Sequence, residues 1–137
     1  MGYYIEQREC INFLLKKEKF DDALQAIKRL KGKETIKDSS GRHFSWVDDN
    51  YAHAGTLKEA LSAWRWEVSF DEDGNITRLD FDGQKMGDDE ILLKAIAPHV
   101  ESGMLEFQGE EGERWRWVFK DGKLREQNSE FRWSEDE

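Results

Sequence analysis

The last third of the chain places the strongest constraint on the fold, because short segments of alternating hydrophobicity follow one another with only tight turns between them. Strands are expected over 104–108, 114–120 and 124–126, separated by a Glu-Gly turn and an Asp-Gly turn. Strands joined by turns this short pair antiparallel. The stretch therefore predicts a three-stranded meander.

Two further strand signals lie upstream. Residues 66–70 and 76–81 alternate on either side of the turn sequence DEDGN, which predicts a hairpin. The segment 3–15 reads as a strand whose apolar residues share one parity: Tyr3, Ile5, Ile11, Phe13 and Leu15.

Three segments carry helix signals. Apolar residues recur at helical spacing over 17–31. A second helix is expected to begin at Thr56, because the sequence TLKE forms a capping box in which the Thr56 hydroxyl accepts from the Glu59 amide. Asp88 is the expected N-cap of a third helix, which ends near the single proline, Pro98.

Together these elements predict an α+β fold, with a mainly antiparallel four- to six-stranded sheet and three helices packed on one face. A length of 137 residues without a Gly/Ser-rich or Pro-rich linker favours a single domain over 1–137. The polar, turn-rich segment 33–55 is expected to form a long loop, which is a natural place for function. The tail 134–137 is expected to fray.

Charge and composition limit the classes of partner. The formal net charge is -9, and the aromatic content of 12% is too high for a disordered chain. Binding to phosphate backbones is driven by Lys and Arg, so the charge balance disfavours nucleic acid as a partner. It fits a basic protein partner better, or solubility alone.

The single cysteine, Cys10, excludes an intramolecular disulfide and reads as a passive thiol. The first ten residues do not resemble a signal peptide, and no apolar run approaches the roughly 20 residues needed to span a bilayer. We therefore expect a cytoplasmic protein without membrane association. The sequence carries no signal for a particular oligomeric state.

The turn of the predicted hairpin imitates a calcium-binding loop. Five residues within 69–80 fall at positions of the EF-hand template: Asp71, Asp73, Gly74, Ile76 and Asp80. Ser69 stands where the first acidic ligand belongs, and the flanking segments alternate as strands rather than helices. A β-turn with an acidic rim is therefore the better interpretation.

The segment 33–55 contains a second set of metal-ligand types: His43, Asp48, Asp49 and His53. These side chains suit zinc or another transition metal. Their spacing matches no metal motif, and His and Asp are frequent in loops for turn reasons. We predict neither a metal nor another cofactor, and no nucleophile elbow or phosphate-binding loop is present.

The tripeptide Trp-Arg-Trp occurs twice, at 64–66 and at 115–117. In the second copy, strand alternation separates the aromatic side chains from Arg114 and Arg116. We expect the aromatic face to pack in the core and the arginines to be exposed beside cross-strand acids from Glu106 or Glu126. Stacking of single-stranded bases on this strand is the alternative.

Acidic turns provide the remaining candidate surface. They include Asp71, Asp73, Asp88 and Asp89, which we expect to contact a partner, as we do Arg114 and Arg116. Mostly such residues are solvated turn residues, but together they can form a negative surface that recruits a basic protein or imitates DNA.

Four stretches of the chain resemble a family of small uncharacterised proteins from bacteria, phages and other mobile elements: "GRHFSWVD", "TLKEALSAWRWE", "GDDEILLKAIAPHV" and "GERWRWVFKDGK". The resemblance covers most of the chain from the first predicted helix onward. The family has no established activity, so the resemblance implies no site residues. Its phage association implies a host-interaction or anti-defence role.

Three hypotheses follow. The first is a non-enzymatic protein-binding module, one form of which is a phage or mobile-element inhibitor of a host nucleic-acid-handling or defence system. The second is a small metal-binding domain or enzyme centred on His43 and His53. The third is a single-stranded nucleic-acid binder acting through Arg114–Trp117.

Overall fold

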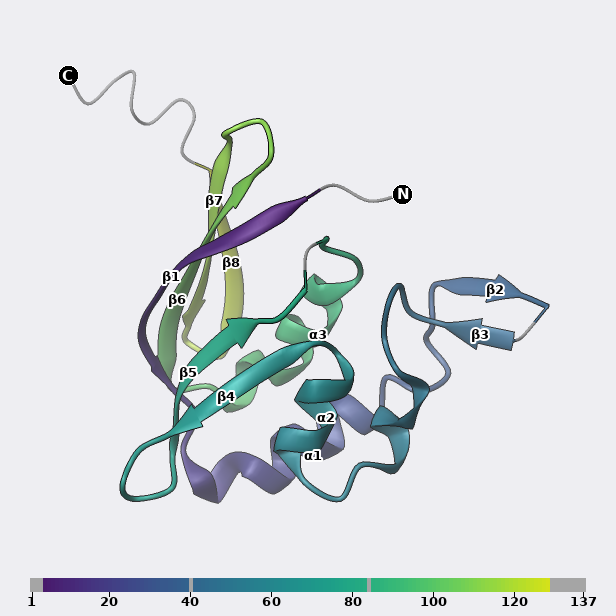
Figure 1. Ribbon diagram of the computed structural model, residues 1–137. Helices are drawn as coiled ribbons and strands as arrows, with labels where there is room; N and C mark the ends of the chain where they lie inside the picture. Colours follow the sequence, from purple (N-terminus) through teal and green to yellow (C-terminus); the bar gives the residue numbers. More distant parts are fainter. Residues whose placement is uncertain (1–3, 40, 84, 129–137) are drawn as a thin grey trace.

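The computed structural model describes residues 4–39, 41–83 and 85–128, and its fold is α+β with antiparallel sheets, as predicted (Figure 1). The α-helices are α1 (Phe20–Lys28), α2 (Leu57–Ala63) and α3 (Asp89–Ile96). The strands are β1 (Ile5–Leu14), β2 (Ile36–Asp38), β3 (Gly41–His43), β4 (Trp66–Phe70), β5 (Ile76–Phe81), β6 (Ser102–Gly109), β7 (Arg114–Lys120) and β8 (Lys123–Asn128). Short 3-10 helices cover Lys17–Lys19, Asp49–His53 and Ala97–His99.

The main sheet has four strands in the order β1-β6-β7-β8, and each pair of neighbours is antiparallel. Strands β6, β7 and β8 form the predicted meander. The two residues between β7 and β8, Asp121 and Gly122, have φ angles of 56° and 76°. Positive φ at both central residues is what a type I′ hairpin turn requires. The three α-helices lie to one side of this sheet (Figure 1).

The predicted hairpin of β4 and β5 lies against β1 rather than within the main sheet. The Gln7 side chain joins the two parts: its Nε2 donates to the Leu79 carbonyl at 3.0 Å, and its Oε1 accepts from the Phe81 amide at 2.6 Å. Their backbones also meet at isolated antiparallel bridges. Leu15 and Ile76 exchange hydrogen bonds of 2.9 and 3.0 Å, and a second bridge joins Tyr4 to Lys85. A side chain thus replaces part of a β-ladder.

Strand β1 departs from the predicted parity. Its pairing with β6 shifts register between Gln7 and Glu9 and again between Ile11 and Leu14. Asn12 has a φ of 54°, which bends the strand locally. The prediction that Ile11 shares the buried face is therefore wrong, because its side chain is exposed on the opposite face. Tyr3, the first residue of the predicted strand, lies outside the described residues.

The segment 33–55 is more structured than a loop. It forms the β2–β3 hairpin, which projects away from the rest of the fold, and then the 3-10 helix Asp49–His53 (Figure 1). The first helix is shorter than predicted, because its first turn is the 3-10 helix Lys17–Lys19. The tail 134–137 lies outside the described residues. None of the described helices has the length and apolarity needed to span a bilayer.

The core between the helices and the sheets is built from large aromatic rings. Trp64 packs against Phe44 and Tyr51, with ring centroids 4.8 and 5.7 Å away, and these two rings also contact each other. Trp64 and Trp66 are both fully buried, although they are two residues apart across a helix end and a strand start. The intervening Arg65 has a φ of 71°, a left-handed conformation that turns the chain between them.

Candidate functional site

A fully buried carboxylate, that of Asp89 at the start of α3, anchors the most unusual group of side chains in the described structure. Its Oδ1 accepts from Trp66 Nε1 at 2.9 Å. Its Oδ2 accepts from Arg65 Nη2 and from the Gly87 amide, both at 3.0 Å. Burial raises the pKa of Asp89, while the two neutral donors and the guanidinium oppose that rise. A buried charge persists only when it is paired and hydrogen-bonded in this way.

The Arg65 guanidinium connects this carboxylate to the surface. Its Nη1 donates to the Lys85 carbonyl at 2.9 Å. Its Cζ lies 4.9 Å from the centroid of the Phe81 ring and 5.3 Å from that of Trp46. Cation–π contacts of this kind gain strength where the cation is partly desolvated. The guanidinium therefore forms a fixed support for the Trp46 indole.

The Trp46 indole, which contacts this guanidinium on one side, is 49% exposed to solvent. The backbone beneath it is held in place as well: the Ser45 amide donates to Asp88 Oδ2 at 2.9 Å. Gly87 packs closely under both residues, since a Cβ atom there would lie 2.8 Å from Ser45 Cβ and 3.1 Å from Trp46 Cε3. Trp46 itself adopts a positive φ of 58°. The indole is thus exposed but positioned by its surroundings.

Tyr4 and Lys85 extend the exposed aromatic area. The Lys85 ammonium lies 4.6 Å from the centroid of the Tyr4 ring, and Tyr4 is about as exposed as Trp46. A shallow groove of about 400 Å³ is lined by Trp46, Arg65, Gly83 and Lys85. We call these four residues and Tyr4 the Trp46 surface.

Two of the predicted contact residues have other roles. Asp89 was expected in an exposed acidic surface, and this expectation is wrong because its carboxylate is fully buried. Asp88 occupies the N-cap position of α3 but does not cap it. Its Oδ2 instead accepts from Thr35 Oγ1 at 2.7 Å and from the Ser45 amide, which ties the segment around β2 and β3 to the start of α3.

The turn between β4 and β5 has the geometry of an acidic β-turn. Asp71 Oδ1 accepts from the backbone amides of Asp73 and Asn75, both at 2.9 Å. The hydrogen bond from the Asn75 amide is the main cause that lowers the pKa of Asp71. The Asp71 carboxylate therefore closes the turn. This turn and the acidic β6–β7 turn lie at opposite ends of the molecule (Figure 1), so they do not form one continuous negative surface.

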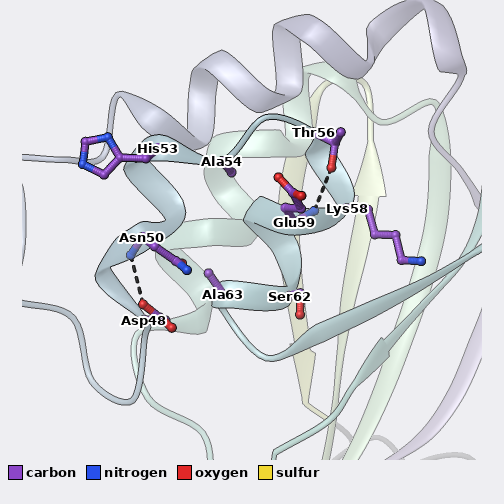
Figure 2. Close-up of a pocket in the computed structure, with 9 residues that line it drawn as sticks. All are labelled: Asp48, Asn50, His53, Ala54, Thr56, Lys58, Glu59, Ser62 and Ala63. Carbon is purple, nitrogen blue, oxygen red and sulfur yellow. Dashed lines mark hydrogen bonds between the residues drawn. The ribbon is translucent and has the colours of Figure 1, made fainter.

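The predicted histidine and aspartate group does not converge. Asp48 and His53 line a polar groove of about 680 Å³, but the His53 ring points away from Asp48 (Figure 2). Asp48 Oδ1 accepts from the Asn50 amide at 3.0 Å, capping the 3-10 helix that includes Asp49. His43 lies on β3. Within the described ranges, no group of three or more His, Cys, Asp or Glu side chains is placed to hold a metal ion.

A second buried carboxylate lies between α1 and the 3-10 helix Asp49–His53. Glu34 Oε1 accepts from the Gly32 amide at 2.8 Å, and its Oε2 accepts from the Tyr51 hydroxyl at 3.1 Å and lies 3.4 Å from Lys31 Nζ. Burial raises the pKa of Glu34, but the hydrogen bonds to it outweigh burial and leave the pKa below its ordinary value. This group of buried, hydrogen-bonded side chains braces the fold.

Strand β7 has the predicted two faces. Trp117 and Phe119 are buried, while Arg116 is exposed and its Nε donates to Glu106 Oε1 at 2.8 Å. Arg114 Nη1 lies 3.5 Å from the other oxygen of Glu106. The prediction that Glu106 is a cross-strand acid beside the two arginines is thus confirmed.

The other predicted cross-strand acid, Glu126, has a different partner. Its Oε1 accepts from Trp117 Nε1 at 3.3 Å. Trp115, the remaining tryptophan of this strand, stacks on Phe107 at a centroid distance of 5.6 Å and is half-buried. Base stacking on β7 would therefore compete with core packing.

Sequence reasoning missed the Arg65–Asp89 pair, because an Asp-Asp sequence at a helix start usually reads as solvated. One signal was available. A buried tryptophan such as Trp66 usually finds an acceptor for its indole N–H. This signal alone does not select Asp89, because Asp80 and Asp82 lie closer to Trp66 in the sequence.

Comparisons of this chain with protein-family models, with curated proteins and with solved structures find no match.

Proposed function

We propose that this protein is a non-enzymatic module that binds another protein through the Trp46 surface. The observation that supports this proposal is a half-exposed indole held in place by a guanidinium that is itself fixed by a buried carboxylate. The few residues that dominate the binding energy at protein interfaces are enriched in Trp, Tyr and Arg. A side chain that is already ordered loses little conformational entropy on binding.

The chemistry of the Trp46 surface favours binding over catalysis. Its charged groups, Arg65 and Lys85, are cations that offer electrostatic attraction rather than proton transfer. The Asp89 carboxylate, which contacts Arg65, is buried, and both of its oxygens already accept hydrogen bonds. The Glu110 carboxylate contacts the edge of the surface, where its Oε1 accepts from the Tyr4 amide at 2.9 Å. A general base has to reach the proton that it abstracts.

The test compares two exposed aromatic residues. Trp46→Ala removes the centre of the proposed contact, and Phe70→Ala is the matched control, because Phe70 is 46% exposed and packs on Phe20 outside the Trp46 surface. Immobilised wild-type protein and each variant are incubated with a lysate of the native host, and retained proteins are identified by mass spectrometry. We expect a protein that wild type and Phe70→Ala retain and that Trp46→Ala loses.

The retained protein is then purified and titrated by calorimetry. Trp46→Ala is expected to weaken its binding by about tenfold or more, as for an interface hot spot. Circular dichroism confirms that the variant is folded. Equal retention by wild type and Trp46→Ala, or equal affinities in the titration, would refute the proposal.

A further inference from the structure

A second surface lies on the face of the main sheet that points away from the helices. Trp117 and Phe119 of β7 face the core, so residues of the other parity face outward. Register then places Lys120 opposite Lys123 and Val118 opposite Arg125 on this outer face. Four exposed cations follow one another there, and we call them the basic stripe: Arg116, Lys120, Lys123 and Arg125.

The basic stripe is only partly neutralised. Arg116 is paired with Glu106 at 2.8 Å. Across residues 4–39, 41–83 and 85–128, no carboxylate forms an ion pair with Lys120, Lys123 or Arg125. Like charges directly opposite each other in a sheet are destabilising, and Lys120 and Lys123 are such a pair. A protein with a net charge of -9 therefore concentrates unneutralised positive charge on one face.

An apolar row lies beside the basic stripe. The register aligns Ile11 of β1, Met104 of β6 and Val118 of β7 across the sheet, and the next residue in the row is Arg125 of β8. Ile11 is exposed, and Met104 and Val118 are half-buried. The outer face thus combines apolar contact area with charge, which are the two components of a specific protein contact.

We propose that the basic stripe and the apolar row bind an acidic, extended polypeptide segment of a partner protein. Charge complementarity selects an acidic ligand, and the apolar row selects one with aliphatic side chains between its acidic residues. An extended segment places alternate side chains on one side, which suits the flat surface of a sheet.

The same features disfavour a nucleic acid on this face. The tryptophans of β7, which would stack with bases, are on the opposite side of the sheet, where Trp117 is buried and Trp115 stacks half-buried on Phe107. A polynucleotide that runs beyond the stripe also meets the negative field of the rest of the protein. A short peptide can confine its charges to the basic stripe.

Binding is measured with a fluorescein-labelled peptide of alternating Glu and Val, about eight residues long, which matches one strand at ~3.3 Å per residue. The variant is Lys123→Glu/Arg125→Glu. The control is Lys19→Glu/Lys58→Glu, which changes the net charge by the same amount at exposed lysines outside the sheet. Fluorescence anisotropy at low salt is expected to show affinity lowered about tenfold or more by the first pair and changed by less than about twofold by the control.

Amide resonances of Met104 and Val118 are expected to shift on peptide addition, and the Trp46→Ala variant is expected to bind the peptide as wild type does. The proposal is overturned if wild type does not bind, or if both double variants lose affinity equally, which would mean a long-range field effect. It is also overturned if oligodeoxythymidylate of equal charge binds more tightly than the peptide. A peptide-free dimer that Lys123→Glu/Arg125→Glu dissociates would overturn it too, by making this face an interface between copies.

Discussion

Removing the Asp89 carboxylate is expected to destabilise the protein far more than removing an exposed carboxylate from an ion pair of similar length. Asp89 is fully buried and lies 3.0 Å from Arg65 Nη2. At this distance an effective dielectric constant of about 20 gives a Coulomb term of about 5.5 kcal/mol, against which desolvation of both charges must be set. Asp89→Ala also leaves Trp66 Nε1 and the Gly87 amide without their acceptor, at about 1–3 kcal/mol each.

The Arg65 side chain is 21% exposed and can regain part of its hydration. We therefore expect Asp89→Ala to lower the free energy of unfolding by about 3–5 kcal/mol, the usual cost of removing one partner of a buried ion pair. That is a large part of the total stability of a domain, which is about 5–15 kcal/mol. Asp89→Asn, which keeps the shape and an acceptor for Trp66 Nε1, is expected to cost less and serves if the alanine variant does not fold.

The matched control is Asp80→Ala. Asp80 lies 2.8 Å from Arg78 Nη2, but the two side chains are 42% and 51% exposed. An exposed pair contributes at most about 1 kcal/mol. Urea unfolding at pH 7, followed by tryptophan fluorescence and circular dichroism, measures both variants. If Asp89→Ala and Asp80→Ala lower the free energy of unfolding equally, burial does not strengthen the effect of the Asp89 carboxylate. The view that a buried charge holds Trp46 in place would then be refuted as well.

Three further predictions concern other parts of the fold. The lowered pKa of Glu34 means that its contribution to stability is present above the unfolded pKa of about 4.3 and is lost as the pH falls through the folded pKa. We therefore expect Glu34→Gln to lower the free energy of unfolding by its largest amount at pH 7 and by less below about pH 4, as measured by urea unfolding at several pH values. Gln7→Ala removes two hydrogen bonds to β5. We expect it to lower the free energy of unfolding by about 1–3 kcal/mol and to speed hydrogen exchange at the Phe81 amide. Unchanged exchange would contradict this role. Gly87→Ala is expected to lower the free energy of unfolding by about 1–3 kcal/mol, measured with urea, because the new Cβ displaces Trp46. The same displacement is expected to weaken binding of the partner. If this variant binds the partner as tightly as wild type does, the position of the indole is not critical.

The elements that could be predicted from the sequence are those set by local rules. The β6–β8 meander follows from alternation and from an Asp-Gly pair that adopts the positive φ angles of a type I′ turn. The start of α2 follows from Thr56, whose hydroxyl accepts from the Glu59 amide at 3.1 Å. The two faces of β7 follow from the period of a strand. None of these inferences needs a contact with a distant part of the chain.

The features that could not be predicted depend on contacts between distant residues. Arg65 and Asp89 are separated by 24 positions, and Gln7 and Phe81 by 74. Local patterns describe Asp89 as a solvated helix-start residue and Gln7 as an interruption in a strand. Their actual roles arise only when α3 closes over Trp66 and when β5 docks against the bulged part of β1. The wrong parity of Ile11 has the same origin.

Arg65 meets two demands that few amino acids satisfy together. Its left-handed backbone, with a φ of 71°, favours Gly or Asn, whereas its guanidinium pairs with Asp89 and stacks on Trp46. Related sequences can therefore separate the two demands. If the backbone turn matters more, position 65 will vary to Gly or Asn while both flanking tryptophans remain. If the charge matters more, Arg65 and Asp89 will be lost or kept together, and Trp46 will change with them.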